Sequence, residues 1–261
     1  EASMGNRKPA GKERLDLLMV SRGLAETREQ AQRLIMAAQV LVDGHASPKA
    51  GHRIRSDAEI QVKTPPRFVS RGGDKLEAAF EAFDLSVNGL TCLDVGSSTG
   101  GFTDCMLQHG AAHVIALDVG TAQLHWKLRQ DARVTVIEQY NARHLKPEDL
   151  PAKPEFASFD VSFISLTLVL PPVIQALSPS SEILTLIKPQ FEAGRDQVEK
   201  GGVVRDPAIR QEVVKRIKYF GVEEQGLEWL GLRESPVLGP AGNVEFLAWW
   251  RKPEDVPRAT A

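Results

Sequence analysis

Short apolar segments alternate with helical patterns through the middle of this chain, and that alternation limits it to one class of fold. Segments typical of strands lie at Thr91–Val95, His113–Leu117, Val134–Ile137, just before Asp160, and at Ile183–Ile187. Helical patterns lie at Leu76–Phe83, Gly101–His109, Ala122–Arg129 and in a segment that runs through Val169. Repeated alternation of this kind predicts an α/β domain with a parallel sheet and helices on both faces.

A glycine-containing loop follows the first of these strands, at the sheet edge where such folds bind ligands. Gly96 and Gly100 allow the backbone to approach a ligand closely, because they carry no Cβ. Their spacing differs from the dinucleotide fingerprint and therefore argues against a nicotinamide cofactor. A tight turn followed by an ordinary helix start is the alternative interpretation.

The loop resembles the D-x-G-x-x-x-G-G loop of class I (Rossmann-like) methyltransferases, which implies S-adenosylmethionine as the cofactor. Asp118, after the second strand, is then placed to accept hydrogen bonds from two ribose hydroxyls. Asn141, after the third strand, would meet the adenine edge, although an ordinary loop asparagine is an equally good interpretation. The predicted cofactor residues are Asp94, Gly96, Ser97, Ser98, Thr99, Gly100, Gly101, Phe102, Asp118 and Asn141.

A small basic module precedes this domain. From Asn6 to Gly73 there are 13 lysines and arginines against 7 acidic residues, although the whole chain carries a net charge of −2. Two helices are predicted within Glu13–Gln39, with Thr27 capping the second. A strand at Val40–Val42, a turn at Asp43-Gly44 and residues Ile54, Ile60 and Val62 complete a small sheet.

This module resembles an S4-like RNA-binding domain, with one departure at Ala38, where relatives usually carry glycine. Arginines suit phosphate because the planar guanidinium donates two hydrogen bonds at once. The predicted RNA-binding residues are Arg14, Arg28, Arg33 and Arg67. A helical protein-interaction module is the alternative. We expect the S4-like domain at residues 7–63, a linker at 64–71 and the methyltransferase domain at 72–252.

Four charged residues lie at predicted strand or helix ends: Lys75, Asp160, Lys188 and Glu245. Each taken alone is typical of a surface charge. Together and in this order, they resemble the Lys-Asp-Lys-Glu tetrad of ribose 2'-O-methyltransferases. The S4-like module, the glycine loop and the segments around these four residues resemble the TlyA, or haemolysin A, family, whose catalytic half is FtsJ-like. The resemblance runs from Lys12 to Arg251.

The resemblance implies an enzyme that methylates the 2'-oxygen of cytidine in ribosomal RNA, with ribosomal RNA or ribosomal subunits as its partner. Lys188 is the candidate general base, since a partly buried lysine can be neutral, and no metal is expected, since the sulfonium is already activated. A membrane-active haemolysin is a rival hypothesis, but no apolar run approaches the roughly 20 residues needed to cross a bilayer. A non-catalytic RNA-binding factor and a small-molecule methyltransferase are further alternatives. Two cysteines, Cys92 and Cys105, outside any metal-ligand spacing favour a reducing cytoplasm. The sequence does not indicate an oligomeric state.

Overall fold

The computed structural model describes residues 11–25, 27–46, 49–64 and 66–254. The chain divides into two compact units, Glu1–Pro66 and Arg67–Ala261. The second unit begins inside the segment predicted as the linker. Phe68 is buried there, and Val69 N donates to the carboxylate of Asp104, 2.9 Å away. Residues after Pro66 are therefore held by the packing of the second unit.

The first unit is a small α+β fold. Its elements are β1 (Lys12–Arg14), α1 (Leu15–Ser21), α2 (Arg28–Met36), β2 (Val40–Val42), β3 (His45–Ala46), β4 (Arg53–Arg55) and β5 (Ile60–Val62). The predicted helix cap is confirmed, since the Thr27 hydroxyl accepts a hydrogen bond from Gln30 N at 3.1 Å. The predicted turn is also confirmed, because Asp43 and Gly44 both have positive φ, 48° and 81°.

Two details of this unit differ from the sequence-based expectation. Glu13 lies in β1 rather than in a helix, because Lys12–Arg14 pairs antiparallel with Arg53–Arg55. Ile54 therefore belongs to a separate two-stranded sheet, while β3, β2 and β5 form the three-stranded one. Both differences result from backbone pairing between β1 and the distant strand β4. The helical spacing of apolar residues from Leu15 onward contains no information about this pairing. Ala38 has a φ of 56°, a conformation that favours glycine.

The second unit is built on a seven-stranded sheet in the order β11-β12-β10-β9-β6-β7-β8. Its strands are β6 (Thr91–Val95), β7 (His113–Leu117), β8 (Val134–Ile137), β9 (Phe156–Phe159), β10 (Glu182–Ile187), β11 (Glu228–Glu234) and β12 (Phe246–Arg251). The five strands from β10 to β8 run parallel, as predicted. The last two are antiparallel, since β12 runs opposite to both β10 and β11.

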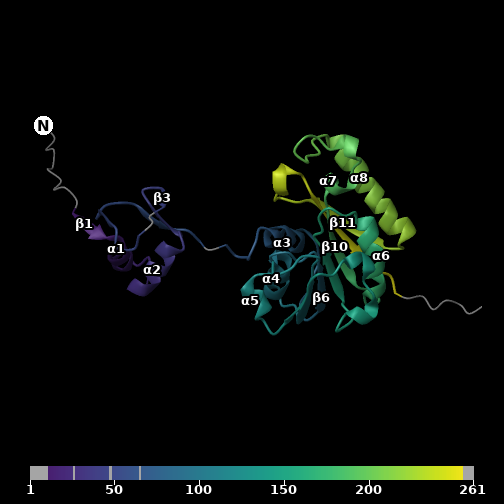
Figure 1. The fold of residues 1–261 in the computed structure, drawn as a ribbon, viewed down its shortest axis with the longest axis horizontal. Helices are drawn as coiled ribbons and strands as arrows, with labels where there is room; N and C mark the ends of the chain where they lie inside the picture. The colour runs from purple at the N-terminus through teal and green to yellow at the C-terminus, as the bar shows by residue number, and fades with distance from the viewer. Residues whose placement is uncertain (1–10, 26, 47–48, 65, 255–261) are drawn as a thin grey trace, which may run out of the picture. The chain divides into compact units, whose positions relative to one another are not determined.

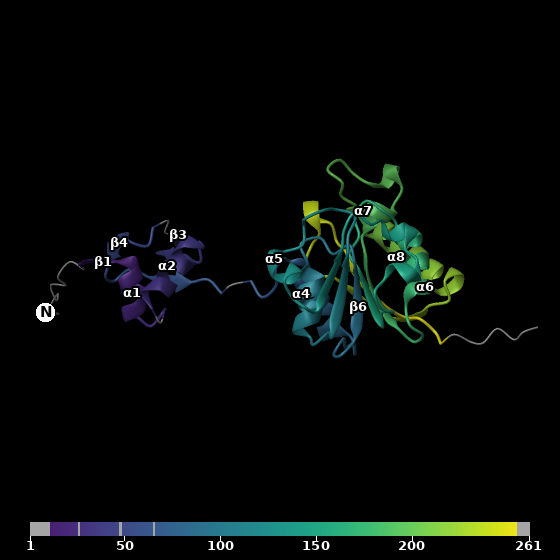
Figure 2. The same cartoon turned by 60° about the horizontal axis from the view of Figure 1, so that its bottom comes forward.

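Helices cover both faces of this sheet, with α3 and α4 on one side and α6 and α8 on the other (Figures 1 and 2). The helices are α3 (Gly72–Ala82), α4 (Gly101–Gln108), α5 (Trp126–Arg129), α6 (Leu166–Ala176), α7 (Pro189–Glu192) and α8 (Pro207–Tyr219). Strand side chains alternate between two apolar cores: Leu93 packs with α6 and α8, whereas its neighbour Cys92 packs with α3 and α4. Burial on both faces explains the continuous apolar strands.

Two helix starts differ from the predicted ones. Helix α3 begins at Gly72 instead of Leu76, and Gly73 in its first turn packs directly against Phe68. Helix α5 begins at Trp126 instead of Ala122, whose positive φ of 55° is incompatible with a helix. The residues between β7 and α5 instead form part of the cavity described below.

Candidate active site

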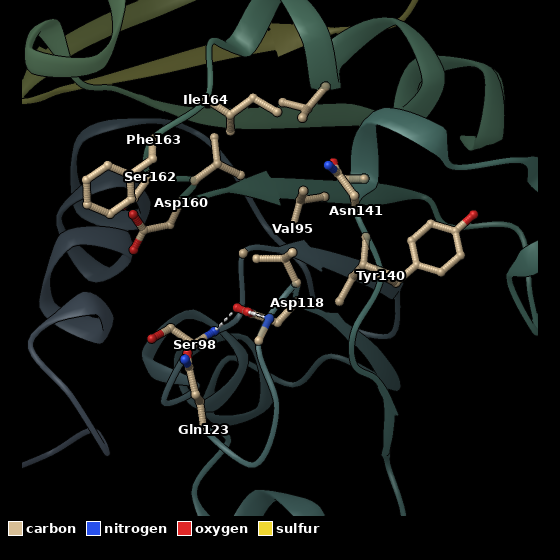
Figure 3. Close-up of a pocket in the computed structure, with 17 residues that line it drawn as sticks. Val95, Ser98, Asp118, Gln123, Tyr140, Asn141, Asp160, Ser162, Phe163 and Ile164 are labelled. Atoms are coloured by element: carbon tan, nitrogen blue, oxygen red, sulfur yellow. Dashed lines mark hydrogen bonds between the residues drawn. The ribbon is translucent and has the colours of Figure 1, made fainter.

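The carboxyl ends of the parallel strands surround a cavity of about 490 Å³ (Figure 3). This size lies within the usual range for small-molecule sites, roughly 300–1,000 Å³. The lining residues are Val95, Gly96, Ser98, Leu117, Asp118, Val119, Gly120, Gln123, Tyr140, Asn141, Ala142, Asp160, Val161, Ser162, Phe163, Ile164 and Val169. Carboxylates at one side and aliphatic side chains at another fit a ligand that is polar at one end and flat and apolar at the other.

The glycine loop forms one wall of the cavity, and its geometry requires glycine. Gly96 has a φ of +82°, and a Cβ at this position would lie 2.4 Å from the carbonyl oxygen of Asp160. Gly100 has a φ of +104°, and a Cβ there would lie 2.3 Å from Leu128 Cδ1. The first contact involves the backbone of the neighbouring strand end, which has little freedom to move. Gly96 therefore lets β6 and the end of β9 approach each other beside the ligand site.

Asp118 lies at the end of β7 with its carboxylate at the cavity. Its Oδ2 accepts a hydrogen bond from Ser98 N and its Oδ1 accepts one from Gly120 N, each at 2.7 Å (Figure 3). These bonds fix the carboxylate between the glycine loop and the loop after β7. Each oxygen keeps acceptor capacity for a further donor, so the pair can accept from two adjacent hydroxyls.

Several predicted cofactor residues do not line the cavity. Asp94 is fully buried below the loop, where its carboxylate accepts from Thr103 Oγ1 at 2.7 Å and from Ser158 Oγ at 3.4 Å. Burial raises the pKa of Asp94 to about 7, while the bond from Thr103 acts in the opposite direction. The side chain thus ties β6 to α4 and β9. The other predicted residues outside the cavity lining are Ser97, Thr99, Gly100, Gly101 and Phe102.

Asn141 lines the cavity, but part of its side chain has a local function. Its Oδ1 accepts from Arg143 N at 3.0 Å and so caps the 3₁₀ turn Ala142–His144. Tyr140 lies beside it, with its hydroxyl bonded to His144 O at 3.1 Å and to Asp149. Sequence reasoning missed Tyr140, although its position in the short loop after β8 was a usable signal.

The four charged residues predicted as a tetrad form two ion pairs. Lys75 Nζ lies 2.7 Å from Glu245 Oε2, and Lys188 Nζ lies 2.7 Å from Asp160 Oδ1. Glu245 is completely buried and both lysines nearly so, whereas Asp160 faces the cavity with 23% of its side chain exposed. Charged side chains are retained in buried positions only when they are paired, so the burial of Glu245 and of the two lysines depends on these contacts.

Residues beside the tetrad complete its hydrogen bonding, and sequence reasoning gave them no role. Ser162 Oγ accepts from Lys188 Nζ at 3.1 Å, and Gln190 Nε2 donates to Glu245 Oε1 at 3.0 Å. Gln190 Oε1 is buried and accepts no hydrogen bond from any described residue, which costs about 1–3 kcal/mol. Phe163, with a φ of 62°, is 90% exposed at the cavity and packs against Phe191. All of these residues lie within the sequence motifs around Asp160 and Lys188.

The predicted RNA-binding arginines lie in different surroundings. Arg14 and Arg28 both bind the buried carboxylate of Asp16, at 2.9 Å and 3.0 Å, and remain 39% and 49% exposed. The Arg14 guanidinium lowers the pKa of Asp16 well below its usual range. Arg33 is exposed on α2. Arg67 belongs to the second unit, where it is paired with Glu77 at 2.6 Å.

No helix among the described residues is long and apolar enough to cross a membrane. One group of three possible metal ligands occurs in the described parts of the chain: Glu77, Cys105 and His109. This group lies on α3 and the end of α4, away from the residues that line the cavity. Its carboxylate already binds Arg67 and His109. The expectation of metal-free chemistry stays a prediction.

Comparisons with known proteins agree with this architecture. Residues 68–252 match the model for FtsJ-like methyltransferases, and residues 13–60 match the S4 domain. The Bacillus subtilis protein YqxC is 52% identical over 90% of this chain and 84% of its own length. The "16S/23S rRNA (cytidine-2'-O)-methyltransferase TlyA" of Mycobacterium tuberculosis is 44% identical over 94% of this chain and 92% of its own length.

A solved structure from Streptococcus thermophilus, which carries the name hemolysin, superposes with a TM-score of 0.71 at 47% identity. It covers 96% of this chain and 93% of that one. The similarity to these proteins therefore extends through both domains of this chain. The chain belongs to the TlyA family of methyltransferases, in which an S4 domain precedes an FtsJ-like domain.

Proposed function

We propose that this enzyme transfers a methyl group from S-adenosylmethionine to the 2'-oxygen of cytidine in ribosomal RNA. The observation that carries the proposal is the two ion pairs, Lys75–Glu245, which is buried, and Lys188–Asp160, whose carboxylate faces the cavity that Asp118 also lines. Cytidine and ribosomal RNA come from the name of the Mycobacterium tuberculosis relative. Such a substrate implies that the enzyme acts in the cytoplasm.

The cavity fits the cofactor by its donors and acceptors. The carboxylate of Asp118 would accept from the two ribose hydroxyls, and the backbone around Gly96 and Ser98 would face the rest of the cofactor. Ile164 and Val169 would supply apolar surface for the base, with Asn141 near its edge. When bound, the cofactor supplies a methyl group on a positively charged sulfur. That group needs no metal to activate it.

Lys188 removes the proton from the 2'-hydroxyl in this proposal. A ribose hydroxyl is a poor nucleophile, and a general base within hydrogen-bond reach makes attack on the methyl group possible. To accept the proton, the amine must be neutral when RNA is bound. Asp160 and Ser162 orient Nζ through contacts of 2.7 Å and 3.1 Å. After transfer the resulting ammonium remains paired with Asp160.

Lys75 and Glu245 form the second, more deeply buried pair. Because Glu245 is completely enclosed, its charge is compensated by Lys75 and by the amide of Gln190. We assign this pair the role of holding the attacking ribose oxygen in line with the methyl group. Alignment of this kind supplies a large part of the rate enhancement in bimolecular transfers.

RNA is held in part by the first unit. The guanidinium groups of Arg14, Arg28 and Arg33 are available for phosphates at its surface. Asp16 fixes the first two side chains, which reduces the conformational entropy lost when a phosphate binds. Arg67 would contact RNA from the second unit.

Lys188→Arg tests the proposal. The full-length protein is mixed with ribosomal RNA and cofactor that carries a deuterated methyl group, and the RNA is digested to nucleosides for mass spectrometry. The wild type is expected to give deuterated 2'-O-methylcytidine. Lys188→Arg keeps a positive charge but cannot release a proton near neutral pH, so it is expected to give none. Labelled product from the arginine variant at a rate near wild type would exclude Lys188 as the base.

A further inference from the structure

The short helix α7 follows Lys188 directly and carries two polar side chains that take no direct part in the methyl transfer. Gln190 points to the ion pair Lys75–Glu245, and Glu192 points to the start of α6. Helix α7 thus lies between the two halves of the tetrad. The contacts of these two side chains determine how firmly the two ion pairs are held relative to each other.

Gln190 connects α7 to the buried pair. Its Nε2 donates to Glu245 Oε1 at 3.0 Å, while Lys75 Nζ binds the other carboxylate oxygen at 2.7 Å. The close packing depends on Gly239, because a Cβ there would lie 2.1 Å from Glu245 Oε1. Both oxygens of Glu245 are therefore fixed, one by a lysine from α3 and one by α7.

The other end of the Gln190 amide shows that this side chain is not suited to packing alone. Its Oε1 is buried and accepts no hydrogen bond from the described part of the chain. An apolar side chain of similar size would fill the same space without a buried unsatisfied oxygen. The contribution of the glutamine is thus the bond to Glu245.

Glu192 connects α7 to the segment that carries Asp160 and Ser162. Its Oε2 accepts from Ser165 Oγ at 2.7 Å, and its Oε1 accepts from Leu166 N at 2.8 Å. Ser165 in turn caps α6 by accepting from Thr167 N at 3.2 Å. Burial raises the pKa of Glu192, and the bonds from Ser165 and Leu166 oppose that rise. The loop between β9 and α6 is thereby tied to the helix that follows Lys188.

We infer that Gln190 and Glu192 are positioning residues that hold the pairs Lys75–Glu245 and Lys188–Asp160 in register through α7. This inference rests on the proposed function, since it assigns both residues to the same methyl transfer. They act through Glu245 and through the loop that carries Asp160, without contact to the reacting atoms. Their loss should therefore slow the chemical step and leave cofactor binding unchanged.

The test compares Gln190→Leu and Glu192→Leu with a matched control, Glu182→Leu, in the full-length protein. Glu182 lies at the opposite end of β10 and accepts from Arg251 Nη2 and Trp249 Nε1, at 3.1 Å and 3.2 Å. Single-turnover methylation of ribosomal RNA is measured together with the cofactor Kd and the Tm. The two α7 variants should lose about 10- to 100-fold in rate with a cofactor Kd within about twofold of wild type. The control should lose stability only.

Two conservative variants separate positioning from general packing. Glu192→Gln can still accept from Leu166 N and donate to Ser165, so it should restore most of the rate lost in Glu192→Leu. Gln190→Glu places a second carboxylate against Glu245, with only Lys75 to balance both. Its rate relative to wild type should rise as the pH is lowered, because a protonated Glu at this position can donate as the amide does.

Wild-type rates in both leucine variants would overturn the inference. A ratio of the Gln190→Glu rate to the wild-type rate that stays constant with pH would also overturn it. Equal rate losses in Glu192→Leu and Glu182→Leu would also overturn it, because general destabilisation would then explain the effect. Failure of the proposed function has a different signature. In that case the wild type itself gives no labelled 2'-O-methylcytidine, whatever the variants do.

Discussion

Gly96→Ala is the substitution for which the structure gives the sharpest expectation. The glycine has a φ of +82°, and the new Cβ would lie 2.4 Å from Asp160 O and 2.9 Å from the carbonyl carbon of the same residue. Neither contact is to a flexible side chain. The substitution must therefore displace either the glycine loop or the end of β9, which carries Asp160 into the cavity.

The expected loss has two components. A non-glycine residue in the left-handed region costs about 1–2 kcal/mol. Forcing the backbone of Asp160 away adds about 1–3 kcal/mol, the usual range for overpacking. The total is about 3 kcal/mol, which lowers Tm by roughly 6–12 °C in a domain of this size. Gly226→Ala is the matched control, because Gly226 also has a positive φ, +69°, but nothing lies within 4 Å of the added Cβ.

Tryptophan fluorescence during thermal unfolding suits this comparison. All four tryptophans, Trp126, Trp229, Trp249 and Trp250, belong to the second unit and therefore report on it alone. Calorimetry with S-adenosylmethionine gives the ligand affinity of the same samples. Gly96→Ala should melt well below Gly226→Ala and bind the cofactor at least about tenfold more weakly. Equal melting temperatures and equal cofactor affinity in the two variants would refute the reasoning.

Three further predictions follow from the same contacts. Asp118→Ala removes the carboxylate proposed to bind the ribose, and a hydrogen bond to a charged group is worth about 1.5–3 kcal/mol, so calorimetry should show cofactor binding at least about tenfold weaker; unchanged affinity would exclude Asp118 as a cofactor contact. Replacing Arg14 and Arg28 together by alanine should flatten the slope of log Kd for RNA against log salt by up to about 2, and an unaltered slope would show that neither contacts phosphate. The pKa of Asp94 rises from 3.8 in the unfolded chain to about 7, so the folded protein keeps a proton that the unfolded chain has lost. Stability should therefore fall as the pH rises from about 4 to about 7, by a few kcal/mol, and Asp94→Asn should abolish that decline in a pH series of urea unfolding curves.

Local patterns in the sequence were sufficient for the central part of the fold. The strands at Thr91–Val95, His113–Leu117 and Val134–Ile137 lie where the pattern of apolar residues predicted them. Helical segments between these strands predicted that the strands are parallel, because a helix can return the chain to the same edge of the sheet. The late strand expected near Glu245 is β12, but its antiparallel direction was not predicted, because strand direction depends on the path of the chain. Helix α8 and strand β11 were not predicted.

The same distinction holds at the site. The sequence alone indicated that Gly96 and Asp118 lie together at strand ends, where they line the cavity, since parallel strands bring their carboxyl ends to one edge. It could not indicate that Asp94 would be buried below the loop, because burial depends on α4 and β9 packing around it.

The pairing of charges was decided only by the tertiary structure. Lys75 and Glu245 are 170 positions apart, and no local pattern indicates that they pair with each other in preference to Asp160 or Lys188. Sheet order brings the start of β12 beside the end of β10, and the packing of α3 brings Lys75 to the same point. The spacing of apolar residues that predicts a helix or a strand is a local property of the sequence and does not depend on how the elements pack. Contacts between buried charges depend on which elements become neighbours, and the free energy of the whole packed domain determines that.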